Sequence, residues 1–405
     1  MAMTDDAVAR RLPSLTGLRF VATTLVFACH IAVITQFIGG SLGDFVASTF
    51  PLAGPYGVGF FFVLSGFVLT WTARKADRTT SFWRRRVVKI YPSHLVTFAL
   101  AAVLTVVAGR ATGLLDWVTN PLLLHAWVPS LNTSTSFNGV SWSLSCELFF
   151  YLAFPLLLPL LDRIPANRLW WTMGSLAVLI TGAALIAQFL VSDQPRLTII
   201  AGGSLSFGQI WFVYFFPPVR ALEFLVGMTL ARIVLAGRWP RIGLLPAAGI
   251  AVAGYGFVLT APYLFATGGL ASLWFVPLIA AATTADLRDR PSPLRHRAMV
   301  RLGDLSFAFY LVHWMVVVAG TQVIGPETSF GPLGSAAAVA ALFGIALGLA
   351  WALHHGVEMP IMRRFGRHGP AARSDRPEPP PDPVDRPVSA GRRSRRAVRS
   401  GTLRH

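Results

Sequence analysis

Charged residues are scarce in this sequence. Asp, Glu, Lys and Arg make up 13% of its 405 residues, whereas 54% are hydrophobic. A water-soluble domain carries about a quarter charged residues, because water must solvate its surface. The scarcity therefore excludes an ordinary soluble domain and favours a protein whose surface faces lipid.

Cysteine is nearly absent as well. Cys29 and Cys146 both fall in apolar stretches, so we expect them to pack as small apolar residues and to form no disulfide scaffold. The sequence also has no glycine loop of a nucleotide-binding type and no spacing typical of metal ligands. We therefore expect neither ATP hydrolysis nor a metal cofactor.

Long apolar runs fill most of the chain. Each is close to the roughly 20 residues that cross a bilayer as a helix. The predicted spans are residues 15–37, 53–73, 88–109, 140–162, 169–190, 217–236, 242–261, 269–285, 303–323 and 333–357. The sequence thus predicts an all-α polytopic membrane protein, a bundle of about ten transmembrane helices.

Basic residues are concentrated in every second loop between these spans, which are the loops on one side of the membrane. If the N-terminus lies in the cytoplasm, 31 of the 35 Lys and Arg residues fall in cytoplasmic segments. An overcounted pair of spans would break this alternation. The pattern predicts a multi-pass protein of the inner (plasma) membrane with both termini cytoplasmic, and it accounts for the net charge of +17 without a nucleic-acid partner.

The chain divides into two parts of different composition. Residues 1–365 form the predicted membrane-embedded domain. Residues 366–405 are rich in Pro and Arg and have almost no apolar side chain to bury, so we expect a disordered basic cytoplasmic tail.

Two polar residues share one face of the first predicted span. Arg19 and His30 are eleven residues apart, which places them on the same face and about 16 Å apart along the axis. Arg19 alone is compatible with a side chain that reaches the inner headgroups. His30 is harder to explain in hydrocarbon unless it has a partner, because Leu would be tolerated more easily there. It is either a satisfied interhelical histidine or a proton acceptor.

Later spans carry further polar residues. Glu147 is expected at about the depth of His30, some 10 Å below the outer surface. Arg220 and Glu223 are three residues apart and are expected to form a structural ion pair. The ninth span brings Tyr310 and His313 to one face near the middle of the membrane. These positions together predict a polar cavity in the middle and outer part of the bundle.

A basic cluster precedes the third span in FWRRRVVKIYP. Arg84, Arg85, Arg86 and Lys89 are suited to hold phosphate groups by forked and point-charge contacts. Membrane orientation alone also demands basic residues in this loop. The charge by itself therefore identifies no ligand.

Seven segments resemble a known family, the integral-membrane acyltransferases of family 3. They are LPSLTGLRFVATTLVFACH, GVGFFFVLSGFVLTW, FWRRRVVKIYP, VSWSLSCELFFYLAFP, VRALEFLVGMTLAR, LGDLSFAFYLVH and VEMP, and they run from about residue 12 to 365. Members of this family move acyl groups onto glycans, lipid-linked sugars and sugar-bearing natural products. The resemblance implies the same class of reaction for this chain.

The resemblance also assigns site residues near the N-terminus. A basic residue followed after ten residues by histidine marks the family's first span and corresponds to Arg19 and His30, the latter implied to be catalytic. The family's R-x-x-R element corresponds to Arg86 and Lys89, so lysine replaces the second arginine here. Charge is kept at position 89, whereas a forked phosphate contact is not available there.

Two more family elements supply the remaining site residues. The WSLS-x-E element corresponds to Trp142, Ser143 and Glu147, and the S-[FY]-x-x-Y-L-x-H element to Ser306, Tyr310 and His313. Trp142, Ser143, Tyr310 and His313 are the implied substrate-binding residues. Glu147 is grouped with the catalytic residues and would position the acceptor or tune the base.

The resulting hypothesis is an O-acyltransferase that takes an acyl group, acetyl being expected, from acyl-CoA and delivers it to a hydroxyl of a carbohydrate-containing acceptor. His30 would accept the hydroxyl proton or carry the acyl group covalently. Arg19, Arg85, Arg86 and Lys89 would hold the donor's phosphates or polarise its thioester carbonyl.

Two other functions are compatible with polar residues inside the membrane. A proton-coupled transporter of a small polar solute would also use buried His and Glu residues, although no inverted repeat is visible in the sequence. A membrane glycosyltransferase would need acidic residues in an exported loop, where 110–139 offers only Asp116.

Overall fold

The computed structural model describes residues 12–74, 77–198, 203–325 and 327–365. Over these residues the regular secondary structure is helical, and no β-strand is formed apart from two isolated bridges. The all-α prediction is confirmed. The tail predicted for residues 366–405 lies outside the described residues.

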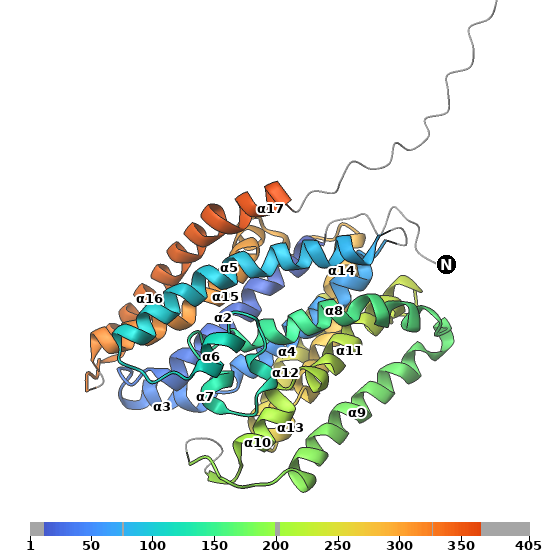
Figure 1. The fold of residues 1–405 in the computed structure, drawn as a ribbon. Helices are drawn as coiled ribbons and strands as arrows, with labels where there is room; N and C mark the ends of the chain where they lie inside the picture. Colours follow the sequence, from blue (N-terminus) through green and yellow to red (C-terminus); the bar gives the residue numbers. More distant parts are fainter. Residues whose placement is uncertain (1–11, 75–76, 199–202, 326, 366–405) are drawn as a thin grey trace, which may run out of the picture. The chain divides into compact units, whose positions relative to one another are not determined.

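Ten longer helices coincide with the ten predicted spans. They are α2 (Pro13–Ile34), α4 (Ala53–Trp71), α5 (Thr79–Val107), α8 (Trp142–Asp162), α9 (Leu169–Leu190), α11 (Pro217–Leu235), α12 (Leu244–Thr260), α14 (Val276–Leu287), α15 (Arg297–Ile324) and α16 (Pro332–Leu353). Figure 1 shows them packed as one bundle. Shorter helices occupy the connections: α3 (Gly40–Thr49), α6 (Leu114–Thr119), η1 (His125–Trp127), α7 (Leu131–Ser134), η2 (Ala166–Arg168), α10 (Phe207–Ile210), η4 (Trp211–Phe215), α13 (Tyr263–Thr267), η5 (Leu270–Phe275), η6 (Pro293–Arg295), η7 (His354–Glu358) and α17 (Met359–Phe365).

Eight helical segments of the described chain are long and apolar enough to cross a membrane. The two predicted spans that do not meet this criterion are α11, which contains Arg220, Glu223 and Arg232, and α12, which has only 17 residues. The chain is therefore a multi-pass membrane protein. The number of ten crossings and the cytoplasmic location of both termini stay predictions.

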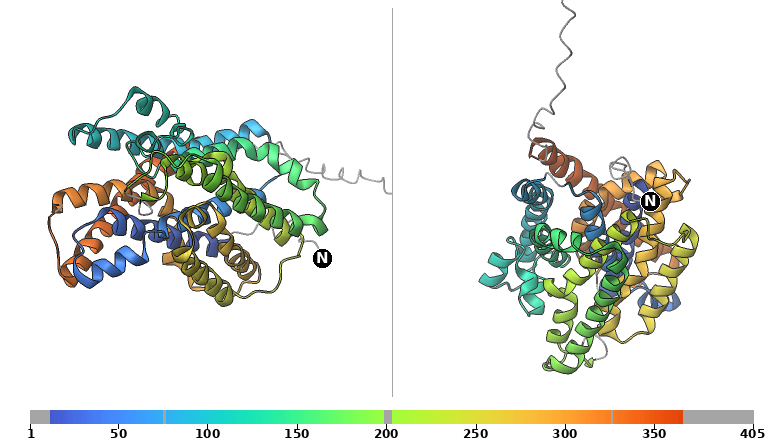
Figure 2. Two further views of the ribbon diagram at one scale, coloured as in Figure 1. Left: turned by 90° about the horizontal axis from the view of Figure 1, so that it is seen from below. Right: turned by 90° about the vertical axis from the view of Figure 1, so that its right-hand side faces the viewer.

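The centre of the bundle is formed by α2 and α4. Helix α2 packs against α4, α14 and α15, and α4 packs against α11. Figure 2 shows α5 on one side of this pair and α12 with α14 on the other. The residues of α2 that carry the predicted chemistry therefore face neighbours on several sides.

Glycines allow α4 and α11 to approach closely. A Cβ atom added at Gly66 would lie 1.9 Å from the carbonyl oxygen of Phe224, and one added at Gly227 would lie 1.9 Å from that of Val63. Small residues at such a crossing let helix backbones come within contact distance, which is a frequent source of helix association in lipid.

The N-terminal end of α2 is fixed by α14. Asp286 accepts hydrogen bonds from the backbone N–H of Ser14 at 2.8 Å and from the Ser14 hydroxyl at 2.7 Å. The first N–H groups of a helix have no partner within the helix, so an acidic side chain there satisfies one of them and favours the helix dipole. This contact fixes the position of α2, and with it that of Arg19 and His30.

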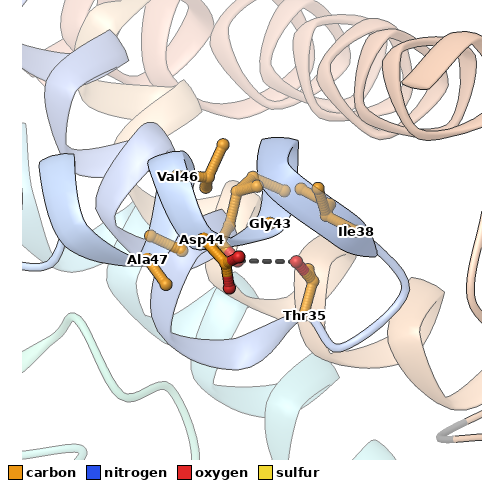
Figure 3. Close-up of a pocket in the computed structure, with 9 residues that line it drawn as sticks. Thr35, Ile38, Gly43, Asp44, Val46 and Ala47 are labelled. Carbon is orange, nitrogen blue, oxygen red and sulfur yellow. Dashed lines mark hydrogen bonds between the residues drawn. The ribbon is translucent and has the colours of Figure 1, made fainter. Parts of the chain in front are cut away.

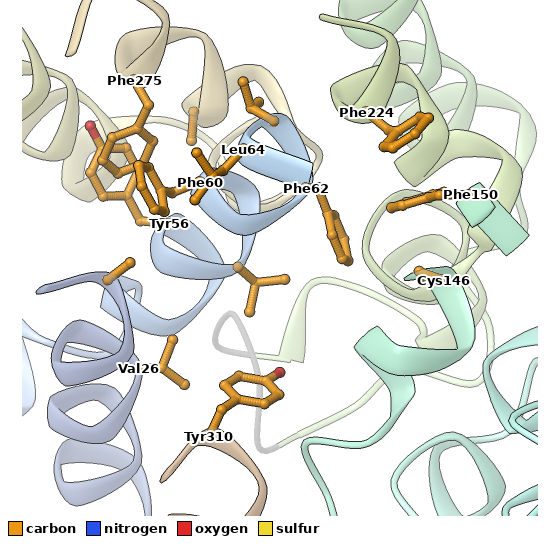
Figure 4. Close-up of a cluster of buried hydrophobic side chains, with 14 of the residues drawn as sticks. Val26, Tyr56, Phe60, Phe62, Leu64, Cys146, Phe150, Phe224, Phe275 and Tyr310 are labelled. Carbon is orange, nitrogen blue, oxygen red and sulfur yellow. The ribbon is translucent and has the colours of Figure 1, made fainter. Parts of the chain in front are cut away.

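Aromatic side chains fill much of the interior (Figure 4). Phe62 of α4 lies 5.0 Å from Phe150 of α8 between ring centroids, and Phe150 stacks on Phe224 of α11 at the same distance. Cys29 and Cys146 are both free and buried. The expectation that they pack as apolar residues is confirmed.

The predicted ion pair on α11 is confirmed. Arg220 and Glu223 are each 1% exposed, and their charged groups approach to 3.0 Å. Arg220 also donates a hydrogen bond of 2.9 Å to the carbonyl of Thr267 in α13, and its guanidinium carbon lies 5.0 Å from the centroid of the Phe62 ring. All of these contacts are made within the bundle, which favours a structural role for the pair, although Arg220 Nε and both Glu223 carboxylate oxygens form no hydrogen bond among the described residues.

Candidate active site

The two histidines of the predicted site meet across α2 and α15. His30 Nδ1 lies 2.8 Å from His313 Nε2, although the residues are 283 positions apart in sequence. His30 is partly exposed, whereas His313 is fully buried at 0% exposure. The partly exposed imidazole of His30 is therefore held by a second imidazole that is fully buried.

Aromatic rings enclose the histidine pair. Phe309 stacks on His313 with ring planes 6° apart, and Phe27 lies 6.3 Å from His313 between centroids. Trp314 meets His30 edge-on at 4.8 Å. The Trp314 ring lies so close to Gly139 that an added Cβ there would be 2.6 Å from it. The pair thus sits in a tightly packed, largely apolar frame.

A hydrogen-bonded hydroxyl lies one turn from His313. The Tyr310 ring centroid is 5.8 Å from that of His313, and the Tyr310 hydroxyl contacts Ser143 Oγ at 2.8 Å and donates to the carbonyl of Val140 at 3.1 Å. Figure 4 shows Tyr310 turned towards the interior of the bundle. Tyr310 and Ser143, both predicted as substrate-binding residues, therefore bind each other.

A second polar group is formed by three cations around one carboxylate. Glu147 lies within electrostatic range of Lys89, Arg19 and Arg86. Among the described residues none of these three cations forms an ion pair within 4 Å of a carboxylate. We call Arg19, Arg86, Lys89 and Glu147 the cation cluster.

Aromatic contacts hold the cation cluster in place. The guanidinium carbon of Arg86 lies 5.3 Å from the Phe82 ring centroid and 5.7 Å from that of Tyr151. Tyr151 in turn donates a hydrogen bond of 3.3 Å to Glu147. Arg86 Nε is buried without a hydrogen-bond partner in the described part of the chain. The cluster therefore keeps at least one buried donor unused.

Glu358, for which the sequence motifs predicted no role, lies at the edge of this cluster. Glu358 is within electrostatic range of Lys89 and lies 2.9 Å from His354 Nδ1, within the π-helical turn η7. Helix η7 packs on α5. The sequence signal for Glu358 was the VEMP segment, which supported the family resemblance but suggested no role for this residue. The π-helical turn is a second signal, because such turns occur often at functional sites.

The expected depth of Glu147 needs correction. Glu147 was predicted at the depth of His30, but in the structure it lies in electrostatic range of Arg19, which is eleven residues away from His30 on α2. The reason is that the segment before α8 lies inside the bundle, where Asn138 Nδ2 donates to the carbonyl of Leu311 at 2.8 Å. Helix α8 therefore begins near the middle of α15, and Glu147 lies further in.

Two other predicted site residues have partners of their own, although Arg85 lies within electrostatic range of Arg86 in the cation cluster. Arg85 forms an ion pair with Asp77 at the start of α5. Trp142 is 4% exposed and packs on Tyr214 and Phe215, with ring centroids 4.6 and 4.8 Å away. Arg85 is thus already paired, and the Trp142 ring belongs to the aromatic core.

The connection before α8 is a buried polar layer. His125 is fully buried and contacts Ser141 Oγ at 3.1 Å, while Ser141 donates to the carbonyl of Asn138 at 2.8 Å. Burial, together with nearby His94, lowers the pKa of His125 to about 3. His125 is therefore neutral at physiological pH and helps to fix the start of α8.

A cavity of about 250 Å³ lies between the end of α2 and α3 (Figure 3). Ile31 and Thr35 line it from α2, and Gly43, Asp44 and Ala47 line it from α3. Over the described residues, no group of three or more His, Cys, Asp or Glu side chains could hold a metal ion.

Comparison with known proteins assigns the chain to a family. The family described as "Acyltransferase domain" (Acyl_transf_3) matches residues 12–355, and the chain belongs to this family. It is 40% identical to Acyltransferase MdmB of Streptomyces mycarofaciens over 381 residues, which cover 92% of this chain and 96% of that protein.

More distant relatives extend the same result. Nodulation protein 10 of Rhizobium leguminosarum bv. viciae is 28% identical over 72% of this chain and 81% of its own length. O-acetyltransferase OatA of Staphylococcus aureus is 24% identical over 76% of this chain, which corresponds to 51% of the relative. No solved structure matches the chain significantly.

The protein is therefore a membrane-embedded O-acyltransferase. Family membership decides between this hypothesis and that of a proton-coupled transporter.

Proposed function

We propose that the protein transfers an acyl group, acetyl being expected, from acyl-CoA to a hydroxyl of a carbohydrate-containing acceptor. The observation that carries this proposal is the presence, in one bundle, of a partly exposed imidazole with a buried partner and of a cation cluster with an unused donor. The first is suited to accept a proton and the second to hold an anion.

The cation cluster is the proposed donor site. Arg19, Arg86 and Lys89 bring three positive charges within electrostatic range of Glu147, and Glu358, which contacts His354, is within electrostatic range of Lys89. The excess of positive charge favours an anionic ligand, and the phosphates of coenzyme A have the required charge. The buried Nε donor of Arg86 would be satisfied by a phosphate oxygen.

The histidine pair is the proposed transfer site. Arg19 and His30 lie on the same face of α2, separated by about 16 Å along the helix axis. An extended thiol arm of the donor spans a distance of this order, so phosphates at the cation cluster are compatible with a thioester near His30. If the N-terminus is cytoplasmic, the donor binds from the cytoplasm and the acceptor is acylated closer to the outer surface.

The proposed step conserves atoms and charge. His30 removes the proton of the acceptor hydroxyl, whose oxygen forms a bond to the thioester carbonyl carbon. The carbon–sulfur bond then breaks, and His30 returns the proton to the sulfur of the leaving coenzyme A. General base catalysis of this kind contributes about 10²- to 10⁴-fold to a rate.

The nature of the acyl group and of the acceptor is supported by the relatives. The Staphylococcus aureus relative is named an O-acetyltransferase, which supports an acetyl donor and a hydroxyl acceptor. The resemblance to the family supports a glycan, a glycolipid or a glycosylated metabolite as the molecule that bears this hydroxyl.

The test is acyl transfer by the purified protein in lipid nanodiscs. Acetyl-CoA labelled in the acetyl carbon would be offered with methyl glycosides, a lipid-linked sugar and a glycosylated macrolide, and the products separated and counted. We expect labelled ester on one acceptor class. Coenzyme A release without labelled ester would contradict the proposed acceptor, and labelled ester from a donor other than acyl-CoA, with none from acetyl-CoA, would contradict the donor.

A further inference from the structure

We infer that His313 is a positioning residue that fixes His30 in the tautomer protonated on Nδ1, so that Nε2 of His30 is the reactive nitrogen. This inference rests on the proposed function and adds to it which nitrogen reacts and what determines the choice. It follows from four atoms of one hydrogen-bonded chain: the Phe309 carbonyl oxygen, the two ring nitrogens of His313 and Nδ1 of His30.

The tautomer of His313 is determined first. His313 Nδ1 lies 3.1 Å from the carbonyl oxygen of Phe309, one turn earlier on α15. A carbonyl oxygen only accepts hydrogen bonds, so Nδ1 of His313 must carry the proton. A neutral His313 then has its lone pair on Nε2.

The protonation of His30 follows from that of His313. His30 Nδ1 lies 2.8 Å from His313 Nε2, and one of the two nitrogens must donate. Because His313 Nε2 holds a lone pair, His30 Nδ1 is the donor and His30 Nε2 holds the lone pair. Within the described residues no hydrogen bond occupies that nitrogen, and the His30 side chain is partly exposed.

The opposite arrangement would require a doubly protonated His313. Its ring is 0% exposed, is stacked on Phe309 and lies near Phe27. Neither histidine has a carboxylate within 4 Å among the residues that the structure describes. A charged imidazole in such surroundings would lose its hydration without gaining a counter-ion. The neutral His313 is therefore the stable form.

This arrangement determines what His313 does during transfer. When His30 Nε2 takes the hydroxyl proton, the new positive charge is shared with Nδ1, whose proton points at the lone pair of His313. The bond between the rings then becomes charge-assisted and stronger, while His313 keeps its own proton on the Phe309 carbonyl. His313 thus orients the base and stabilises its charged form without exchanging a proton.

A pair of substitutions at position 313 separates positioning from simple packing. In His313→Gln the side-chain oxygen can still accept from His30 Nδ1, and the amide can donate to the Phe309 carbonyl. His313→Leu keeps comparable bulk and removes the acceptor. We expect kcat to fall on the order of 100-fold in His313→Leu with an unchanged KM for acetyl-CoA, and at least a tenfold recovery in His313→Gln. Equal loss in both variants, or loss expressed only in KM, would contradict the inference.

Nitrogen NMR of the histidine-labelled protein in nanodiscs measures the tautomer without any activity. The His30 signals are assigned by their disappearance in His30→Gln. We expect Nδ1 to carry the proton and Nε2 to lack it, with this preference lost in His313→Leu. The reversed tautomer in an active enzyme would refute the inference and leave the function standing. The expected tautomer in a protein that acylates no acceptor would instead refute the proposed function.

Discussion

Two groups of buried charges in this protein differ in one respect that separates fold from function. Arg220 and Glu223 on α11 pair with each other at 3.0 Å, and both are 1% exposed. Arg19, Arg86 and Lys89 gather around Glu147 without such a pair and remain partly exposed. In the first group the two opposite charges are paired and enclosed within the chain, whereas the second keeps an excess of positive charge that is partly exposed.

The histidines show the same contrast. His125 is fully buried, neutral and bonded within a polar layer that supports α8. His30 is tied through one nitrogen to His313 and is partly exposed. A polar group that the chain encloses completely supports the fold, whereas a group that stays partly exposed is accessible to a ligand.

Removing one charge of the Arg220–Glu223 pair has the largest expected effect, a loss of folding stability. In Arg220→Ala the Glu223 carboxylate would remain buried beside Gly59 and Gly269 without a counter-ion. Such a loss costs about 3–5 kcal/mol of unfolding free energy. We expect poor recovery of folded protein and a much lower unfolding temperature, measured by tryptophan fluorescence in detergent.

The matched control removes both charges together. The double variant Arg220→Met with Glu223→Leu should regain most of the stability, because no uncompensated charge remains. If Arg220→Ala unfolded at the wild-type temperature, the structural role of the pair would be wrong.

Removing the imidazole of His30 should affect activity and leave stability nearly unchanged. His30→Ala eliminates the proposed base, so acyl transfer should fall by about 10²- to 10⁴-fold. The unfolding temperature in the same detergent should stay close to that of the wild type, because His30 is partly exposed. Thr24→Val, on the same helix with its hydroxyl bonded to the Phe20 carbonyl, serves as control and should stay active. Full activity of His30→Ala would remove His30 from the mechanism.

Changing position 89 should alter donor binding. Lys89→Ala removes one of three charges of the cation cluster and should raise the KM for acetyl-CoA by about 10- to 150-fold, since one charged hydrogen bond contributes about 1.5–3 kcal/mol. Lys89→Arg restores a forked donor and should preserve or improve donor affinity. Arg85, which is paired with Asp77, offers the contrast: Arg85→Ala should change this KM less than Lys89→Ala does. A larger effect at position 85 would mean that the cation cluster is not the donor site.

The smallest expected effect is the loss of folding stability at acidic pH that His125 causes. The unfolded chain takes up a proton on this histidine near pH 6.5, whereas burial delays the uptake in the folded protein to about pH 3. Acidification between these values therefore favours the unfolded state. We expect the unfolding temperature to drop from pH 7 to pH 5, and to drop less in His125→Gln, which keeps a donor to Ser141 and cannot be protonated. An equal drop in both proteins would show that His125 does not contribute.

Much of the fold was accessible from the sequence because its causes are local. Apolar runs of helix length located the helices, and the i, i+3 spacing of Arg220 and Glu223 predicted their pairing. The motifs also placed the chain in its family. Hydropathy was less decisive at α11 and α12. Both helices form at predicted spans, but α11 contains three charged residues and α12 has only 17 residues, so neither is both long and apolar enough to count as a membrane-spanning helix.

The arrangement of the site was less accessible because its contacts join distant segments. Glu147 was expected beside His30, but it lies with Arg19 and Lys89 because the segment before α8 is buried and shifts the whole helix along α15. Glu358 was overlooked, since its approach to Lys89 depends on η7 packing against α5.

The sequence by itself determined that this chain is a helical membrane protein of an acyltransferase family, since hydropathy and motif order depend only on the residues present. Only the tertiary structure decided that His30 meets His313 rather than Glu147, and that each ring nitrogen of His313 has a defined partner. A hydrogen bond requires atoms within about 3 Å at a fitting angle. Across 283 residues, only the packing of α2 against α15 produces that geometry.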